Sequence, residues 1–484
     1  TFNISEGNKF RVGEISFTGI GDLSASKLRR VMQLREWSWL TSWLSGKGRF
    51  DSDLLVDDRQ TLLAYIRDQG YLDVKIPESA IQIENPEENI VNIKIGVDLG
   101  KQYSVGQITV AGNTLFSDAE ILDETELETG DVFSPSQVAR ATEEIRLFYG
   151  SDGYLETFVR AMRSPNLETG AIDLTYQISE SQKFDVESIN LQGNTKTKSI
   201  VIIRELALAP GDTFDLRRMR NSQLRLENTR YFDSVNLRPE STNIPGKKDL
   251  SISVQEGRTG NLTFGAGFSS VEKAVFFAEI SQGNFDIFNW RSYFQGDGQK
   301  FRIRFQIGSQ SNEIVIAFEE PWLFERQLAF GFDIFRRETD FNSTEYNELR
   351  TGFDVYLRKR LFELVEGRIS YTLENVEIFD VSENASQQIK EEEGTKLISK
   401  VGLTLTRDTR DRLIMTRKGN RLEYSTQVAG GPFGGDVDYW KNQIWASQFI
   451  PTFETLNQGI AVYGRVGTIV PYGDSNVPFF ARFF

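Results

Sequence analysis

The feature that most restricts the fold of this chain is a segment that occurs three times in its first half. Each copy runs from an aromatic residue through a valine and an isoleucine to a glycine, at residues 10–19, 103–112 and 184–193. An amphipathic stretch typical of a helix follows, most clearly at 54–68 and 136–149. Long-period repetition of this kind indicates tandem structural units.

Each copy ends in the same way. Gly70 and Gly153 come after the helical stretches, where glycine favours a left-handed helix C-cap. Alternating apolar and polar residues then predict closing strands at 90–97, 172–178 and 250–254. Strand, helix, helix, strand, strand describes a small α+β module whose helices pack on one face of a short mixed sheet.

These patterns divide the chain into five parts. Residues 1–7 are expected to form the last strand of a preceding module, because they match the ends of the other modules, and the numbering is therefore expected to start inside a longer precursor. Three complete modules follow, and the final part has a different pattern. The predicted parts are 1–7, 8–100, 101–181, 182–257 and 258–484.

From residue 260 onward the helical period disappears and apolar residues alternate with polar ones, as in 262–268 and 302–307. We count eleven such stretches, with aromatic residues near their ends. Strands that alternate apolar-out and polar-in are typical of a transmembrane β-barrel, which must close because lipid cannot pair backbone groups. Bacterial barrels have an even number of strands, so eleven predicts a truncated barrel. A soluble sandwich or solenoid is the alternative.

Composition excludes most catalytic chemistry. The chain has no histidine and no cysteine, which removes a Ser-His-Asp triad, a Cys-His pair and a thiolate zinc site. The net charge of −14 argues against a nucleic-acid partner. We therefore expect a binding and folding protein that is not an enzyme and needs no cofactor.

The modules resemble the POTRA domain, the periplasmic repeat of an outer-membrane insertase and secretion superfamily, and the whole chain resembles the BamA branch of that superfamily. Phe-Glu-Glu-Pro-Trp-Leu at 318–323 looks like the family's turn between early strands. Residues 405–419 resemble its D-T-R-D and P-T-x-G hairpin, with Met415 where proline is usual. Residues 478–484 are similar to the segment before its V-R-G-F loop. The resemblance implies a barrel of about sixteen strands, of which this chain holds the first eleven or so.

The same resemblance implies strand exchange at a weak seam, where an unfolded outer-membrane protein client adds a strand to the first barrel strand. Glycines at 265 and 267 fit this role because glycine weakens a strand and leaves its backbone approachable, although they are equally explained as relief of crowding in a curved barrel. The predicted seam strand consists of Asn261, Leu262, Thr263, Phe264, Gly265, Ala266, Gly267 and Phe268. The implied location is the bacterial outer membrane with the modules in the periplasm. The implied partners are clients, accessory outer-membrane lipoproteins and the lipid bilayer.

Two further groups of residues are candidate sites. Trp37, Trp39, Leu40 and Trp43 form an apolar insertion in the first module, which is either core or a loop for docking a partner. A charge network at the barrel rim is predicted for Arg407, Asp408, Arg410 and Asp411.

Other functions of similar proteins stay open. A two-partner secretion pore has a similar build but generally two modules, and a translocation and assembly subunit has three. The three modules and extra strand expected here favour the assembly factor over both. A periplasmic binding scaffold would require residues 258–484 to fold in water.

Overall fold

The computed structural model describes residues 10–38, 42, 48–87, 89–166, 170–269, 273–340, 345–412, 414–452, 458–473 and 476–483. The chain forms two compact units. One runs up to Ile189 and takes in Leu208–Arg220 and Pro239–Leu250, and the other consists of Asn190–Ala207, Asn221–Arg238 and the residues from Ser251 onward.

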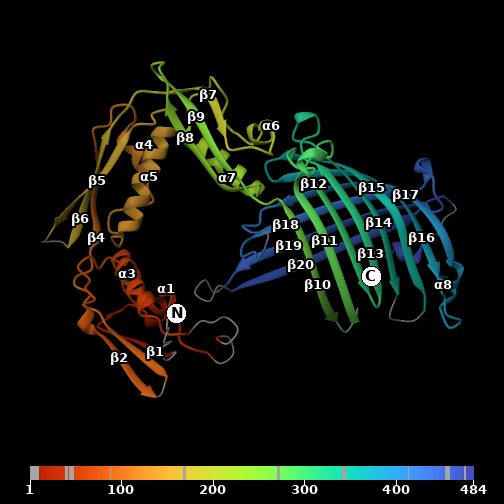
Figure 1. The fold of residues 1–484 in the computed structure, drawn as a ribbon, viewed down its shortest axis with the longest axis horizontal. Coiled ribbons are helices and arrows are strands. Elements are labelled where there is room, and N and C mark those ends of the chain that lie inside the picture. The colour runs from red at the N-terminus through yellow and green to blue at the C-terminus, as the bar shows by residue number, and fades with distance from the viewer. Residues whose placement is uncertain are drawn as a thin grey trace, which may run out of the picture. The chain divides into compact units, whose positions relative to one another are not determined.

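Three α+β modules occupy the first half, as predicted (Figure 1). In each, the first strand lies beside the last, and the middle strand lies at the far edge, in the orders β1-β3-β2, β4-β6-β5 and β7-β9-β8. The first module has β1 (Arg11–Thr18), α1 (Ala25–Val31), α3 (Ser52–Asp68), η1 (Glu78–Ala80), β2 (Ile81–Glu87) and β3 (Ile90–Gly96). The second has β4 (Ser104–Ala111), α4 (Asp118–Asp123), α5 (Pro135–Ser151), β5 (Phe158–Asn166) and β6 (Ala171–Ser179). The third has β7 (Asp185–Gln192), α6 (Ser199–Ile203), α7 (Leu216–Thr229), β8 (Phe232–Ser241) and β9 (Lys247–Glu256).

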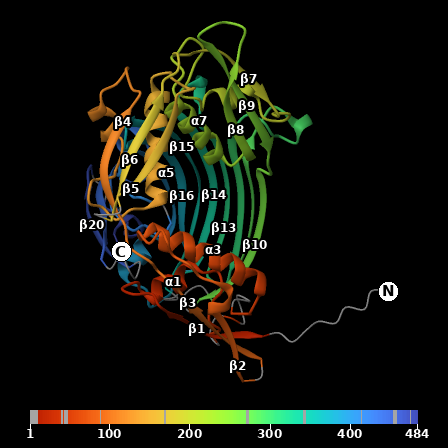
Figure 2. The same cartoon turned by 90° about the vertical axis from the view of Figure 1, so that its left-hand side faces the viewer.

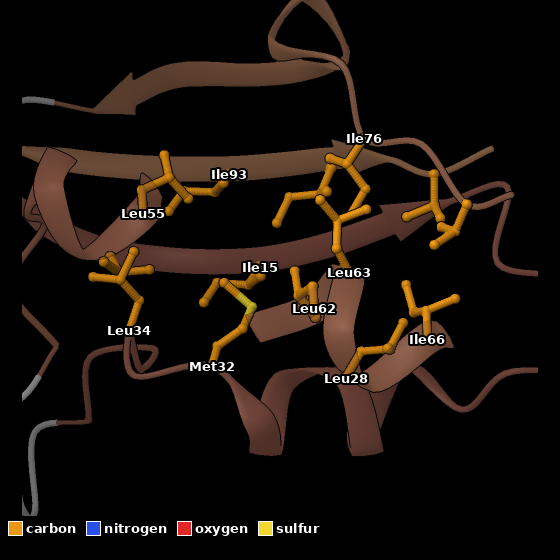
Figure 3. Close-up of a cluster of buried hydrophobic side chains, with 14 of the residues drawn as sticks. Ile15, Leu28, Met32, Leu34, Leu55, Leu62, Leu63, Ile66, Ile76 and Ile93 are labelled. Atoms are coloured by element: carbon orange, nitrogen blue, oxygen red, sulfur yellow. The ribbon is translucent and has the colours of Figure 1, made fainter. Parts of the chain in front are cut away.

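Local sequence explains where the long helices begin and which face they bury. The Asp51 carboxylate accepts hydrogen bonds from the Asp53 and Leu54 amides, which caps α3. In the first module, Leu62 and Ile66 of α3 belong to the same buried apolar cluster as Ile93 of the central strand (Figure 3). The predicted left-handed glycine after the helix is present, with Gly70 at φ 91°.

The glycine that ends each repeat is required by close backbone packing. Gly19, Gly112 and Gly193 have φ values of 75°, 84° and 92°, in the left-handed region that other residues rarely adopt. A Cβ at these positions would overlap the carbonyl oxygen of Val97, Ile178 or Val254, each near the end of the module's last strand. The repeat therefore preserves glycine because the turn and the last strand touch through their backbones.

A glutamate after the last strand holds the same turn. The Glu180 carboxylate accepts hydrogen bonds from the backbone amides of Thr114 and Leu115 at 2.8 and 3.0 Å and from the Tyr149 hydroxyl at 2.9 Å. Glu256 repeats the arrangement with the amides of residues 195–197. Burial opposes ionisation of Glu180, but the hydrogen bonds from Thr114 and its neighbours outweigh it, so the pKa of this carboxyl lies below its ordinary value.

The second half forms one antiparallel sheet of eleven strands in sequential order, β10 to β20, which confirms the predicted strand count and fold class. Figure 2 shows several of these strands side by side, with β10 at one edge. No helix among the described residues is both long and apolar enough to cross a membrane. The strands are β10 (Gly260–Ser269), β11 (Lys273–Phe285), β12 (Gln299–Gly308), β13 (Ser311–Glu320), β14 (Ala329–Asp340), β15 (Asn347–Phe362), β16 (Val365–Phe379), β17 (Gly394–Asp408), β18 (Gly419–Ala429), β19 (Tyr439–Pro451) and β20 (Gly459–Pro471). Short helices between them are η2 (Trp290–Ser292), η3 (Leu323–Glu325), α8 (Gln387–Glu391), η4 (Gly431–Phe433) and η6 (Phe479–Ala481).

Replacing Glu180 by glutamine should loosen the turn at residues 112–117. Glutamine keeps the shape but loses the charge that strengthens each hydrogen bond, so we expect local stability to fall by about 1–2 kcal/mol. Hydrogen exchange at the Thr114 and Leu115 amides measures this, with the exposed Glu128→Gln in the same module as the control. Because the folded-state pKa is depressed, the wild-type advantage is present above the ordinary carboxyl value of 4.5 and disappears as the pH falls through the lower folded value. Equal exchange in both variants would contradict the assignment.

Candidate functional site

One face of the eleven-stranded sheet is apolar from strand to strand. A single row of paired residues crosses seven strands and contains only leucine, isoleucine and phenylalanine. Its members are Leu262, Ile280, Ile303, Ile316, Ile334, Phe353 and Leu373. Phe264 and Phe276, on this face of β10 and β11, are 78% and 62% exposed, so no part of the described chain covers them. A large bare apolar surface of this kind marks contact with lipid.

The opposite face, one residue along each strand, is polar. The neighbouring row runs through Ser281, Arg302, Ala317, Asp333, Asp354, Thr372 and Lys400. Ion pairs join its charges to adjacent strands, with Arg368 to Asp354 at 2.7 Å and Lys400 to Glu374 at 2.6 Å. The four side chains of these two ion pairs line a cavity of about 560 Å³. The two faces together have the apolar-out and polar-in pattern of a barrel wall.

The predicted seam strand, Asn261–Phe268, lies within β10. In the described part of the chain β10 pairs with β11 and is the first strand of the sheet. Leu262, Phe264 and Phe268 are on the apolar face and are 67%, 78% and 83% exposed, and Ala266 shares that face. Asn261, Thr263, Gly265 and Gly267 alternate with them on the polar face. The strand that the sequence singled out is therefore the first strand of the sheet, and its role as a seam stays a prediction.

The two seam glycines have different surroundings. Gly265 is opposite Phe277 of β11, and a Cβ at Gly265 would lie 2.8 Å from the Phe277 ring. An aromatic ring packed over a cross-strand glycine stabilises the pair and fixes its register. A Cβ at Gly267 would meet nothing within 4 Å. Gly265 thus makes room for a ring, whereas Gly267 leaves the backbone accessible, so each of the two explanations offered by the sequence fits one glycine.

A second feature, which the sequence did not reveal, is a cavity of about 690 Å³ at the start of β10. Asn261, Lys300, Asp333 and Tyr356 line it from the polar face of the sheet, and Tyr231 lines it from the connection between α7 and β8 of the third module. The Tyr231 hydroxyl donates to the Gly298 carbonyl oxygen at 3.2 Å. Only strand register brings these residues together, so no motif could have indicated them.

The predicted tryptophan docking group is only partly described. Trp37 is half-buried, its backbone amide donates to the Val12 carbonyl oxygen at 2.7 Å, and the Arg11 guanidinium lies 4.4 Å from its ring centre. These contacts make Trp37 part of the module's own packing. Trp39, Leu40 and Trp43 lie outside the described residues.

The predicted rim residues form three separate contacts. Arg410 and Asp408 make a two-point ion pair, with the shortest distance at 2.7 Å. Arg407 donates to the Asn420 side chain at 3.1 Å across the β17–β18 pair. The Asp411 carboxylate accepts from the amides of residues 417 and 418, at 3.0 and 3.2 Å. These contacts brace one hairpin, and they are local rather than a single network.

The hairpin also explains a departure from the family pattern. Met415 has φ of 55°, whereas proline is fixed near −65°, so this turn cannot hold the proline that the family usually has here.

Among the residues that the structure describes, no cluster of histidine, cysteine or acidic side chains has the size needed to hold a metal ion.

Two protein families match the chain. The POTRA family, described as surface antigen variable number repeat, matches residues 10–100, 103–181 and 184–257. The Omp85 superfamily domain matches residues 294–484.

Individual relatives are similar over much of the chain. The outer membrane protein assembly factor BamA of Nitratidesulfovibrio vulgaris is 27% identical over 488 residues, which cover 100% of this chain and 59% of the relative. The BamA of Neisseria meningitidis is 28% identical and covers 70% of this chain, which spans 41% of it. The crystal structure of BamA from Haemophilus ducreyi lacking POTRA domains 1–3 superposes with a TM-score of 0.62 at 19% identity, covering 78% of this chain and 73% of that one. This last likeness shows a shared fold.

The difference between the seam glycines can be measured. Gly265→Ala forces the Phe277 ring to move, which should lower the free energy of unfolding by about 1–3 kcal/mol, whereas Gly267→Ala should change it by less than about 0.5 kcal/mol. Urea unfolding in phospholipid vesicles gives both values. Combining Gly265→Ala with Phe277→Leu should recover part of the loss. Equal losses at the two glycines would contradict the packing role of Gly265.

Proposed function

This chain belongs to the POTRA-repeat Omp85 superfamily, and on that premise we propose that it is an outer-membrane protein assembly factor. It is an outer-membrane protein whose POTRA modules lie in the periplasm. In the proposed function it receives unfolded β-barrel clients there and folds and inserts them into the membrane. Accessory outer-membrane lipoproteins are the proposed partners of the modules.

The observation that carries the proposal is the place of β10 as the first strand of the sheet, with open space beside Gly267. The strand runs over ten residues, Gly260–Ser269, with a partner on one side only in the described chain. A client strand that adds there forms main-chain hydrogen bonds, which accept almost any client sequence. In β10, as in the other barrel strands, apolar residues on one face alternate with polar residues on the other. A client strand that pairs with β10 in matching register therefore places its apolar residues toward lipid. Insertion is then driven by the client's own folding free energy and needs no nucleotide.

The module sheets offer a second type of edge, for clients that are still extended. Residues 49, 132 and 213 form isolated bridges with the beginnings of β1, β4 and β7, so the edge at the first strand of each module is partly covered. The opposite edge of the second module is β5, where Phe158 and Met162 are 64% and 50% exposed. We propose this edge as a transient docking strand, since main-chain pairing and exposed apolar side chains together fit an extended apolar client.

Site-specific crosslinking tests the seam. The chain has no cysteine, so a single introduced thiol reports one position. Thr263→Cys on β10 should crosslink to a cysteine in the terminal strand of a client that is stalled during insertion into proteoliposomes. Thr404→Cys is the matched control, because Thr404 lies on the same face but in β17, which has a paired strand on each side. Equal crosslinking at both positions, or none at position 263, would rule out strand addition at β10.

A further inference from the structure

Two turns at one end of the sheet expose unusually large aromatic side chains. The turn from β11 to β12 carries Phe288, Trp290 and Tyr293, which are 87%, 69% and 86% exposed. The turn from β13 to β14 carries Phe324, which is 83% exposed. β10 follows the third module in the chain, and successive strands of the sheet run in opposite directions. Both turns therefore lie at the end of the sheet where β10 begins. They therefore face the periplasmic side of the membrane.

The backbone of both turns is strained at an aromatic residue. Tyr293 and Phe324 each have φ of 56°, in the left-handed region that costs energy for any residue with a Cβ. If these side chains were in water, they would make no contacts that offset the energy of this backbone conformation. Strained residues persist where the surrounding structure holds them for a purpose, so the strain indicates that the direction of these rings matters.

The first turn is held rigidly. The Ser292 hydroxyl donates to the Gln295 carbonyl oxygen at 2.6 Å, and the Phe294 amide donates to the Asn289 carbonyl oxygen at 3.0 Å. The Ile287 amide donates to the Gln299 side chain at 3.0 Å. The exposed rings thus project from a fixed support.

Stacked rings connect this turn to the apolar face of the sheet. Phe294 stacks on Phe285 with ring centres 5.8 Å apart, and Phe285 stacks on Phe301 at 4.8 Å. Phe301 pairs with Phe318, and both belong to the same face as Ile303 and Ile316. The aromatic surface of the turn is therefore continuous with the wall that contacts lipid.

The same turn is bound to the third module. The Asn284 side chain, which is buried, donates to the Thr197 hydroxyl at 2.9 Å. The Lys198 ammonium lies 3.0 Å from the carboxylates of both Asp286 and Asp297, and its backbone amide donates to the Gly296 carbonyl oxygen at 2.9 Å. The second turn is bound nearby, since the Arg204 guanidinium lies 5.4 Å from the Trp322 ring centre.

The third module departs from its own repeat at these contacts. Ser24 and Ser117 precede the first short helix in the first two modules, and the Ser117 hydroxyl caps its helix. Lys198 holds this position in the third module, although a cation at a helix N-terminus is unfavourable. One residue earlier, Phe116 of the second module packs on Phe148 in the core, and Thr197 replaces it. In place of a helix cap and a core aromatic ring, the third module therefore has Lys198 and Thr197, which bind the turn.

We propose that the aromatic tips of these two turns insert into the headgroup region of the periplasmic phospholipid leaflet, and that the Thr197–Lys198 contacts fix the adjoining part of the third module to this membrane anchor. Tyrosine, tryptophan and phenylalanine favour this zone of a bilayer, where their rings leave water while polar groups stay hydrated. The inference depends on the sheet spanning the membrane and is independent of client insertion.

Spin labelling tests the insertion. The protein carrying Phe288→Cys or Phe324→Cys is labelled with a nitroxide and reconstituted in phosphatidylethanolamine and phosphatidylglycerol vesicles. Leu115→Cys, on an exposed turn of the second module, is the control. The ratio of collisions with oxygen to collisions with a water-soluble nickel chelate should be severalfold higher at 288 and 324 than at 115. A water-like ratio at 288 would overturn the proposal, and so would protection from both reagents, because that result means a protein surface covers the turn.

Distance measurement tests the contact with the module. Labels at Leu224→Cys in α7 and Phe288→Cys should give a narrow distance distribution by electron–electron double resonance. Lys198→Met should broaden it while the label at 288 stays in the bilayer. Lys196→Met is the matched control, because it removes an exposed charge from the same loop. An unchanged distribution in Lys198→Met and in the combined variant with Asn284→Ala would overturn the anchoring role.

Discussion

The structure depends above all on main-chain pairing between neighbouring strands of the eleven-stranded sheet. Within a bilayer no water can satisfy a free amide or carbonyl group, so the ladder must be continuous and its register must hold. A shift of one residue would turn the row that begins Ile280, Ile303 and Ile316 toward the interior and the row of Arg302 and Asp333 toward lipid. Register therefore decides both which surface meets the membrane and where the charges gather.

Close contacts between backbone segments also determine the structure of the smaller modules. A glycine without a Cβ lets the turn after the first strand touch the last strand, and a glutamate at or just after the end of the last strand holds the turn's amides. The modules differ within this turn. The second module places Phe116 there and gains core packing, whereas the third places Thr197 and binds the sheet's own turn. One repeated frame thus supports both an internal module and one that joins a barrel.

Periodicity in the sequence was sufficient to predict the modules, their helices and the number of sheet strands, because each depends on a regular alternation of burial. Periodicity did not predict at which residues the strands begin and end. The stretch predicted at 302–307 is part of β12, which runs from Gln299 to Gly308, because main-chain pairing extends past the predicted stretch at both ends. The seam strand was recognisable from its alternation and glycines. The cavity near Tyr231 and the contact between Lys198 and Asp286 were not, because they join residues that only the fold brings together.

Strand β11 connects the two functional surfaces. At its middle, Phe277 packs against Gly265, and β11 is the strand that pairs with β10 in the described chain. At its end, Asn284 and Phe285 begin the turn that carries the exposed aromatic rings. A break in regular pairing between Gln282 and Phe285 separates these two regions. A bulge of this kind disrupts the ladder locally and bends the strand. The bulge therefore separates the part of β11 that pairs with β10 from the part that leads into the turn bound by the third module.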